Sequence, residues 1–91
     1  MSGLKIAVLG DQGDLDKLRS GFAGTFGLIP GVSFTYTTDI NDITSAMANF
    51  SMVMITYRSD DRRAQALQTL EATCQKLGSW AGRIATFMWS K

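Results

Sequence analysis

Residues 50–57, FSMVMITY, contain four consecutive apolar residues, Met52 to Ile55, between polar flanks. A half-solvated antiparallel strand alternates apolar and polar side chains, and this stretch does not. Both faces of the strand must therefore be covered, which is typical of a central parallel strand between layers of helices. The stretch predicts an α/β fold.

Three further segments are interpreted as strands of the same sheet. Residues 4–9, LKIAVL, are mostly apolar and are interrupted only by Lys5 near the start. Residues 32–37, VSFTYT, alternate strictly, which favours an edge strand with one face partly wet. Residues 83–89, RIATFMW, are predicted to form the fourth strand.

Apolar residues at spacings of three and four predict a helix after each of the first three strands. The first helix is expected to begin at about Asp14, and the second follows Asp39 as its N-cap. The third is expected to begin at Ser59 or Asp60 and to end at Gly78. Its buried stripe is predicted to consist of Ala64, Leu67, Leu70, Cys74 and Leu77.

This alternation of strands and helices with short connections predicts right-handed crossovers and a parallel sheet. The alternating second strand belongs at an edge and the apolar third strand at the centre, so the expected strand order is 2-1-3-4. Residues 1–91 are therefore expected to form one three-layer α/β domain with four parallel strands and three helices. This is the flavodoxin-like order without the last strand and the last helix.

Composition disfavours several classes of function. Nine Lys and Arg against eight Asp and Glu give a net charge of +1, so neither nucleic acid nor a membrane is expected as a partner. There is no histidine and one cysteine, Cys74, so neither a metal site built on those ligands nor an internal disulfide is expected. The chain has no signal-peptide core and no run of about 18 apolar residues, which predicts a soluble cytoplasmic protein.

In its pattern the chain resembles the response-regulator receiver domains over its whole length, without their last strand and helix. Receiver domains carry an acidic pair after the first strand, a phosphorylated aspartate after the third and a Ser or Thr after the fourth. Asp11 lies near the first of these positions and Ser90 near the third. The phosphoacceptor position holds Thr56 or Tyr57, and Asp60 lies too late in the chain. The resemblance implies a receiver-like interaction domain that has lost phosphotransfer through aspartate.

A second pattern is the sequence GDQG at residues 10–13, between a strand and a helix, with Asp39 after the second strand. Dinucleotide sites use such glycines and such an acid. However, Asp16 stands where the fingerprint requires a third glycine, and Asp11 and Asp14 would repel a phosphate. A tight turn with helix caps explains these residues more simply. The carboxylates of Asp11, Asp14, Asp60 and Asp61 could hold Mg²⁺, but helix capping explains them more simply. No cofactor, metal or catalytic group is expected.

Two functions of different class remain. The first is a non-enzymatic protein-interaction or regulatory module, for example an inhibitor of a partner protein. The second is a binder or enzyme for a small phosphorylated ligand or nucleotide at the switch point between the first and third strands. The lack of histidine and of a GK[ST] phosphate loop favours the first. If the switch point holds a ligand, its lining is expected to be Asp11, Gln12, Gly13, Tyr57, Arg58 and Asp60.

The charges at this switch point lead to one further expectation. Arg58 is expected to be its only cation, and to pair with Asp11 or with an acid of a partner. Arg62 and Arg63 are interpreted as part of the exposed face of the third helix.

The sequence also predicts self-association through the fourth strand. Only the first helix is expected on one face of the sheet, so the half of that face over the third and fourth strands would be bare unless residues 26–31 fold over it. The fourth strand is apolar on both faces and would expose a patch of roughly several hundred Å². It is also an edge strand with one late lysine. A homodimer, or a different protein docked there, is expected to use Trp80, Ile84, Phe87, Met88 and Trp89.

Overall fold

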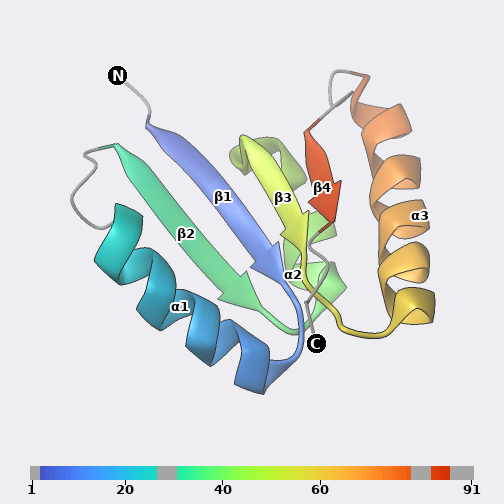
Figure 1. Ribbon diagram of the computed structural model, residues 1–91. Coiled ribbons are helices and arrows are strands. Elements are labelled where there is room, and N and C mark those ends of the chain that lie inside the picture. The colour runs from blue at the N-terminus through green and yellow to red at the C-terminus, as the bar shows by residue number, and fades with distance from the viewer. Residues whose placement is uncertain (1–2, 27–30, 79–82, 87–91) are drawn as a thin grey trace.

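Strands and helices alternate along the chain, which a computed structural model describes over residues 3–26, 31–78 and 83–86. The four strands form one parallel sheet in the order β2-β1-β3-β4 (Figure 1). This confirms the predicted α/β fold and strand order. The elements are β1 (Leu4–Leu9), α1 (Gln12–Phe26), β2 (Val32–Thr37), α2 (Ile40–Thr44), the 3₁₀ helix η1 (Met47–Asn49), β3 (Met52–Ile55), α3 (Asp60–Leu77) and β4 (Ile84–Thr86).

The larger core lies between the sheet and the helices α2 and α3. The register places Ala7 of β1 beside Val53 of β3, and Leu9 beside Ile55. Because side chains alternate along a strand, these four point to the same face of the sheet, and none of them is exposed to solvent. The helical side chains that complete this buried cluster are Ile43, Met47, Ala66 and Leu70, with Tyr57 at the end of β3.

The opposite face of the sheet is covered by α1, which lies over β2 in Figure 1. The ring of Phe22 stacks on that of Phe34, with 5.0 Å between the ring centres. Towards β4 the same face carries Met52 and Met54, which are half-buried, and Ala85, which is exposed. The aromatic contacts of α1 therefore cover the part of this face that is formed by β2.

The helix ends follow the sequence closely. The carboxylate of Asp39 accepts a hydrogen bond from the N–H of Asn41 at 2.9 Å, and the hydroxyl of Ser59 accepts one from the N–H of Arg62. Gly78 adopts the left-handed conformation, φ 76°, that glycine tolerates best. These three positions confirm the predicted starts of α2 and α3 and the predicted end of α3.

Two expectations about helices are wrong. α1 begins at Gln12, earlier than expected, because the carbonyl of Asp11 already accepts a helical hydrogen bond from the N–H of Leu15. Ala64 is exposed and Ala66 is buried in its place, since residues two apart on a helix point roughly 200° away from one another. Leu77, the last residue of α3, is 42% exposed.

Part of the predicted interface lies outside the described residues. This applies to Trp80, Phe87, Met88 and Trp89, and to residues 27–30 of the segment that could cover the sheet. Ile84 is described: it is half-buried and packs against the core cluster of α2 and α3. Its side chain therefore points to the face of the sheet that α2 and α3 cover.

Candidate functional site

The carboxyl ends of β1 and β3 lie side by side and bring two loops together. Thr56, directly after β3, donates hydrogen bonds to the carbonyl of Leu9 from its N–H at 2.7 Å and from its hydroxyl at 3.0 Å. Thr56 is fully buried, and a Cβ atom on Gly10 would overlap its hydroxyl oxygen. Gly10 is therefore required for the close approach of the two chain segments.

Arg58 and Asp14 form an ion pair across this edge. Nε of Arg58 lies 3.0 Å from each carboxylate oxygen of Asp14. Asp14 is buried, whereas the Arg58 side chain is 53% exposed. The hydrogen bond to Asp14 raises the pKa of Arg58, so the guanidinium stays charged. Arg58 was expected to pair with Asp11 or with an acid of a partner. The carboxylate that it contacts at 3.0 Å is instead that of Asp14 in the first turn of α1, and the charge of Asp11 also acts on it.

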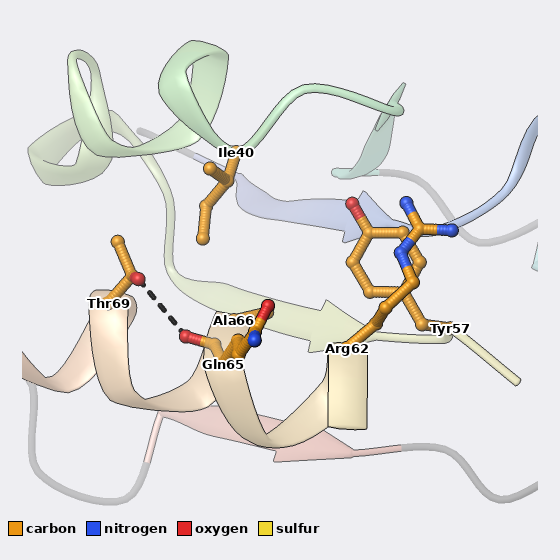
Figure 2. Close-up of a pocket in the computed structure, with 6 residues that line it drawn as sticks. All are labelled: Ile40, Tyr57, Arg62, Gln65, Ala66 and Thr69. Atoms are coloured by element: carbon orange, nitrogen blue, oxygen red, sulfur yellow. Dashed lines mark hydrogen bonds between the residues drawn. The ribbon is translucent and has the colours of Figure 1, made fainter. Parts of the chain in front are cut away.

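A second arginine, Arg62, lies over the ring of Tyr57 (Figure 2). Its guanidinium carbon is 4.1 Å from the ring centre, and its Nη1 is 2.5 Å from a carboxylate oxygen of Asp11. The hydroxyl of Tyr57 donates to the carbonyl of Thr38 at 3.1 Å. Burial raises the pKa of Tyr57, and the nearby positive charge of Arg62 opposes this shift. Arg62 thus links α3 to both the β1–α1 loop and the end of β3.

Arg63 holds the loop between β3 and α3. Its Nη1 donates to the carbonyl of Tyr57 at 2.6 Å and to that of Arg58 at 2.9 Å, and it also pairs with Asp60. Its side chain is only 12% exposed. The interpretation of Arg63 as an exposed residue is therefore wrong, and so is the expectation that Arg58 is the only cation at this edge. The first turn of α3 begins at the ends of the strands, so its side chains reach the loop carbonyls.

The structure brings together four of the six residues predicted to line a ligand site. Asp11, Tyr57, Arg58 and Asp60 join the network of ion pairs and hydrogen bonds. Gln12 and Gly13 are exposed on α1, where the side-chain amide of Gln12 donates to Asp16 of the same helix at 3.1 Å. Arg62 and Arg63 were not expected in the network, and Asp14 was considered only as a helix cap or Mg²⁺ ligand. Their position in the first turns of α1 and α3 could have indicated these contacts.

This carboxyl edge is strongly acidic. All seven aspartates of the chain lie directly before an α-helix or within its first five residues, and α1, α2 and α3 each start at this edge. The arginines beside them are Arg58, Arg62 and Arg63, so these ten described side chains carry a summed charge of −4. Aspartates at these positions stabilise the helices through the partial positive charge of the helix N-terminus. The same concentration of carboxylates repels anionic ligands.

A small pocket beside the network lies between α2 and α3 (Figure 2). Its volume is about 190 Å³, below the range of about 300–1,000 Å³ common for ligand sites. The hydroxyl of Thr69 donates to the carbonyl of Gln65 at 3.0 Å, as the dashed line shows. The remaining lining residues are Ile40, Tyr57, Arg62 and Ala66.

The carboxylates and the cysteine of the described residues were also compared with the requirements of a metal site. In residues 3–26, 31–78 and 83–86, no three acidic or cysteine side chains gather where they could hold a metal ion. The carboxylates of Asp11, Asp14 and Asp60 each face an arginine. Cys74 is half-buried, and burial, followed by the charge of Glu71, raises the pKa of its thiol. The thiol is therefore protonated at neutral pH.

The fold and this edge define a small α/β domain with a parallel sheet, compatible with the flavodoxin-like class. Comparisons with protein families, with curated proteins and with solved structures gave no match. Within the described ranges, no helix combines the length and the apolar character needed to cross a membrane.

Proposed function

We propose that the chain is a small non-enzymatic interaction module, receiver-like in architecture, that regulates a partner protein and pairs with a second copy of itself through β4. One observation carries the proposal. The three arginines of the carboxyl edge are each held by acceptors of their own chain: Arg58 by Asp14, Arg62 by Asp11, and Arg63 by Asp60 and two carbonyls. Because their guanidinium groups already contact acceptors of the same chain, these three arginines are proposed to stabilise the fold rather than to bind a ligand.

The position after β3 supports a receiver-like domain without aspartyl phosphotransfer. Thr56 and Tyr57 occupy the place of the phosphoacceptor, and both are buried. The hydroxyl of Thr56 donates to Leu9, and that of Tyr57 donates to Thr38. Asp60 lies in the first turn of α3, paired with Arg63. These contacts hold the scaffold together and leave no carboxylate at the phosphoacceptor position.

The second function, binding of a small phosphorylated ligand at the switch point, has weaker support. A phosphate would have to displace Asp14 from Arg58 or Asp11 from Arg62, and the displaced carboxylates would stay nearby. The summed charge of −4 on the aspartates and arginines of this edge would oppose its approach. The pocket of about 190 Å³ beside Tyr57 is also small for a nucleotide.

The position of β4 supports pairing with a second copy. In the described part of the chain β4 has a single neighbour, β3, so its other side is a sheet edge. Ala85 and Thr86 are exposed on this strand, and Ala85 lies beside the half-buried Met54. Unpaired strand edges are templates for pairing with another chain.

Light scattering after size-exclusion chromatography at micromolar concentration tests the pairing. We expect a dimer for the wild type and a monomer for Ala85→Lys, which places a charge on β4. Ser33→Lys is the matched control, because Ser33 is exposed on the opposite edge strand β2 and its substitution should leave the mass unchanged. A monomeric wild type, or equal effects of both substitutions, would show that β4 is not the interface.

A thermal-shift screen against acetyl phosphate, Mg²⁺ and nucleotides tests the choice between the two functions. A ligand that binds only the folded chain raises its melting temperature. We expect no ligand of this panel to stabilise the protein through the carboxyl edge. Stabilisation of the wild type that is lost in Arg58→Ala would favour the phosphorylated-ligand function instead.

A further inference from the structure

The amino edge of the sheet, at the upper end of Figure 1, has the opposite charge to the carboxyl edge. Lys5 is the second residue of β1, Lys76 is the penultimate residue of α3, and Arg83 immediately precedes β4. The aspartates of the chain all lie near the other edge. An anion that approaches this molecule is therefore attracted to the amino edge and repelled from the carboxyl edge.

A cavity of about 540 Å³ opens at this amino edge. Its volume lies within the range of small-molecule sites. The described residues that line it include two cations and no carboxylate. The described residues that line it are Gly3, Leu4, Lys5, Ala48, Asn49, Phe50, Ser51 and Arg83.

The backbone holds these residues in fixed register. The N–H of Ser51 donates to the carbonyl of Lys5 at 2.7 Å, and the N–H of Lys5 donates to the hydroxyl oxygen of Ser51 at 3.2 Å. The N–H of Val53 donates to the carbonyl of Arg83 at 3.0 Å. The starts of β1, β3 and β4 are thus tied together, and the cavity is built on adjacent strands of the sheet.

The lining combines positive charge, neutral donors and apolar surface. Lys5 is exposed and takes part in none of the ion pairs of the described residues. The amide of Asn49 and the hydroxyl hydrogen of Ser51 are neutral donors. Leu4 is 45% exposed, one of two large apolar side chains in the described part with high exposure, and Phe50 is half-buried.

We propose that this cavity binds a small organic anion. Its phosphate or carboxylate head is bound by Lys5 and Arg83, with Asn49 and Ser51 as neutral donors, and its apolar body lies against Leu4 and Phe50. In this lining only Arg83 adjoins β4, and Lys5 lies on β1, so Lys5→Gln changes the ligand affinity without altering the strand proposed to pair.

Amide chemical shifts of the ¹⁵N-labelled chain, titrated with phenyl phosphate at low ionic strength, test the site. We expect the shift changes to be confined to Leu4, Lys5, Asn49, Phe50, Ser51 and Arg83. Lys5→Gln and Arg83→Gln should each weaken binding about five-fold, as expected for the loss of one exposed charge interaction. Lys17→Gln is the matched control, because Lys17 is an exposed cation on α1 and its loss should leave the affinity unchanged.

Three comparison ligands define the chemistry. Comparing the affinities of benzoate and phenyl phosphate shows whether the site prefers a carboxylate or a phosphate head. Binding of either ligand supports the proposal. Benzyl alcohol lacks the charge and inorganic phosphate lacks the apolar body, so both should bind more weakly than phenyl phosphate.

Several results would overturn the proposal. Shift changes at Asp11, Arg58 and Arg62 would place the anion at the carboxyl edge, and the absence of changes with both phenyl phosphate and benzoate would remove the site. Equal weakening by Lys17→Gln would show non-specific attraction. Equal binding of inorganic phosphate or benzyl alcohol would contradict the assigned ligand chemistry. If Arg83→Gln does not fold, Lys5→Gln alone decides, because the Lys5 side chain is exposed and its strand contacts are made by the backbone.

Discussion

Arg58 and Asp14 are 44 residues apart in the sequence, yet Nε of Arg58 lies 3.0 Å from both carboxylate oxygens of Asp14. The pair connects the first turn of α1 to the loop after β3. Asp14 is buried, so its carboxylate has lost most of its water and depends on this guanidinium for compensation. The ion pair therefore fixes α1 against the end of the sheet.

Arg58→Ala is expected to lower the free energy of unfolding, because it leaves the buried Asp14 without its cation. The loss should be smaller in an Asp14→Asn background, where no carboxylate needs compensation. Urea unfolding of both single variants and the double variant measures this coupling. Arg62→Ala is the matched control: its partner Asp11 is 42% exposed, so the loss should be smaller. Additive losses at Arg58 and Asp14 would contradict the role of the pair.

Gly10→Ala is expected to destabilise the fold by about 1–3 kcal/mol, the usual cost of overpacking a well-packed site. The new Cβ would overlap the buried hydroxyl of Thr56. Gly13→Ala should instead stabilise by about 0.5–1 kcal/mol, because Gly13 lies within α1 and nothing surrounds its Cβ position. Thermal unfolding compares the two variants. Similar effects at both positions would show that Thr56 does not restrict Gly10.

Tyr57 makes stability sensitive to alkaline pH. Burial raises its pKa above the ordinary value of 10.0, so its contribution is fully present below about pH 10 and is lost as the pH rises through the raised pKa. Tyr57→Phe should reduce this alkaline loss. It should also cost about 0.5–1.5 kcal/mol at neutral pH, since the hydrogen bond to Thr38 is removed.

The second tyrosine, Tyr36, provides the comparison for this prediction. Burial also raises the pKa of Tyr36, and the charge of Arg19 opposes the shift. Tyr36 is only half-buried, so Tyr36→Phe should change the alkaline loss less than Tyr57→Phe. Urea unfolding at a series of pH values from about 8 to about 11 spans the ordinary tyrosine pKa. An unchanged pH profile in Tyr57→Phe would refute the prediction.

Leu70→Ala is expected to destabilise by about 2–5 kcal/mol, as is typical for a fully buried leucine. Leu70 has no exposed surface in the core between α3 and the sheet. Leu77→Ala, at the end of the same helix, should cost less than about 1 kcal/mol, because Leu77 is 42% exposed. Urea unfolding distinguishes the two. Equal costs would mean that Leu77 is buried in solution.

The fold was predictable because local patterns decide it. The apolar run Met52–Ile55 indicated the central strand, and the alternation of residues 32–37 indicated the edge strand. Asp39 and Gly78 marked helix ends through backbone chemistry that does not depend on distant residues. The strand order followed from these local features and from the rules for crossover connections.

The contacts of the carboxyl edge were less predictable. The choice of Asp14 over Asp11 as the partner of Arg58 depends on where the first turn of α1 directs each carboxylate, and a shift in the start of that helix changes the answer. The stripe on α3 shows the same limit, since Ala64 and Ala66 differ only in helical phase. The role of Arg63 depends on loop carbonyls, which have no signature in the sequence.

The separation of charge between the two sheet edges gives the molecule an electric dipole moment parallel to its strands. If two copies pair edge to edge about a twofold axis, their β4 strands run antiparallel. The acidic edge of one copy then lies beside the basic edge of the other, and the two moments oppose. The electrostatic interaction therefore favours this relative orientation while the two copies are still approaching each other. Dissolved salt screens the interaction over about 10 Å at 0.1 M.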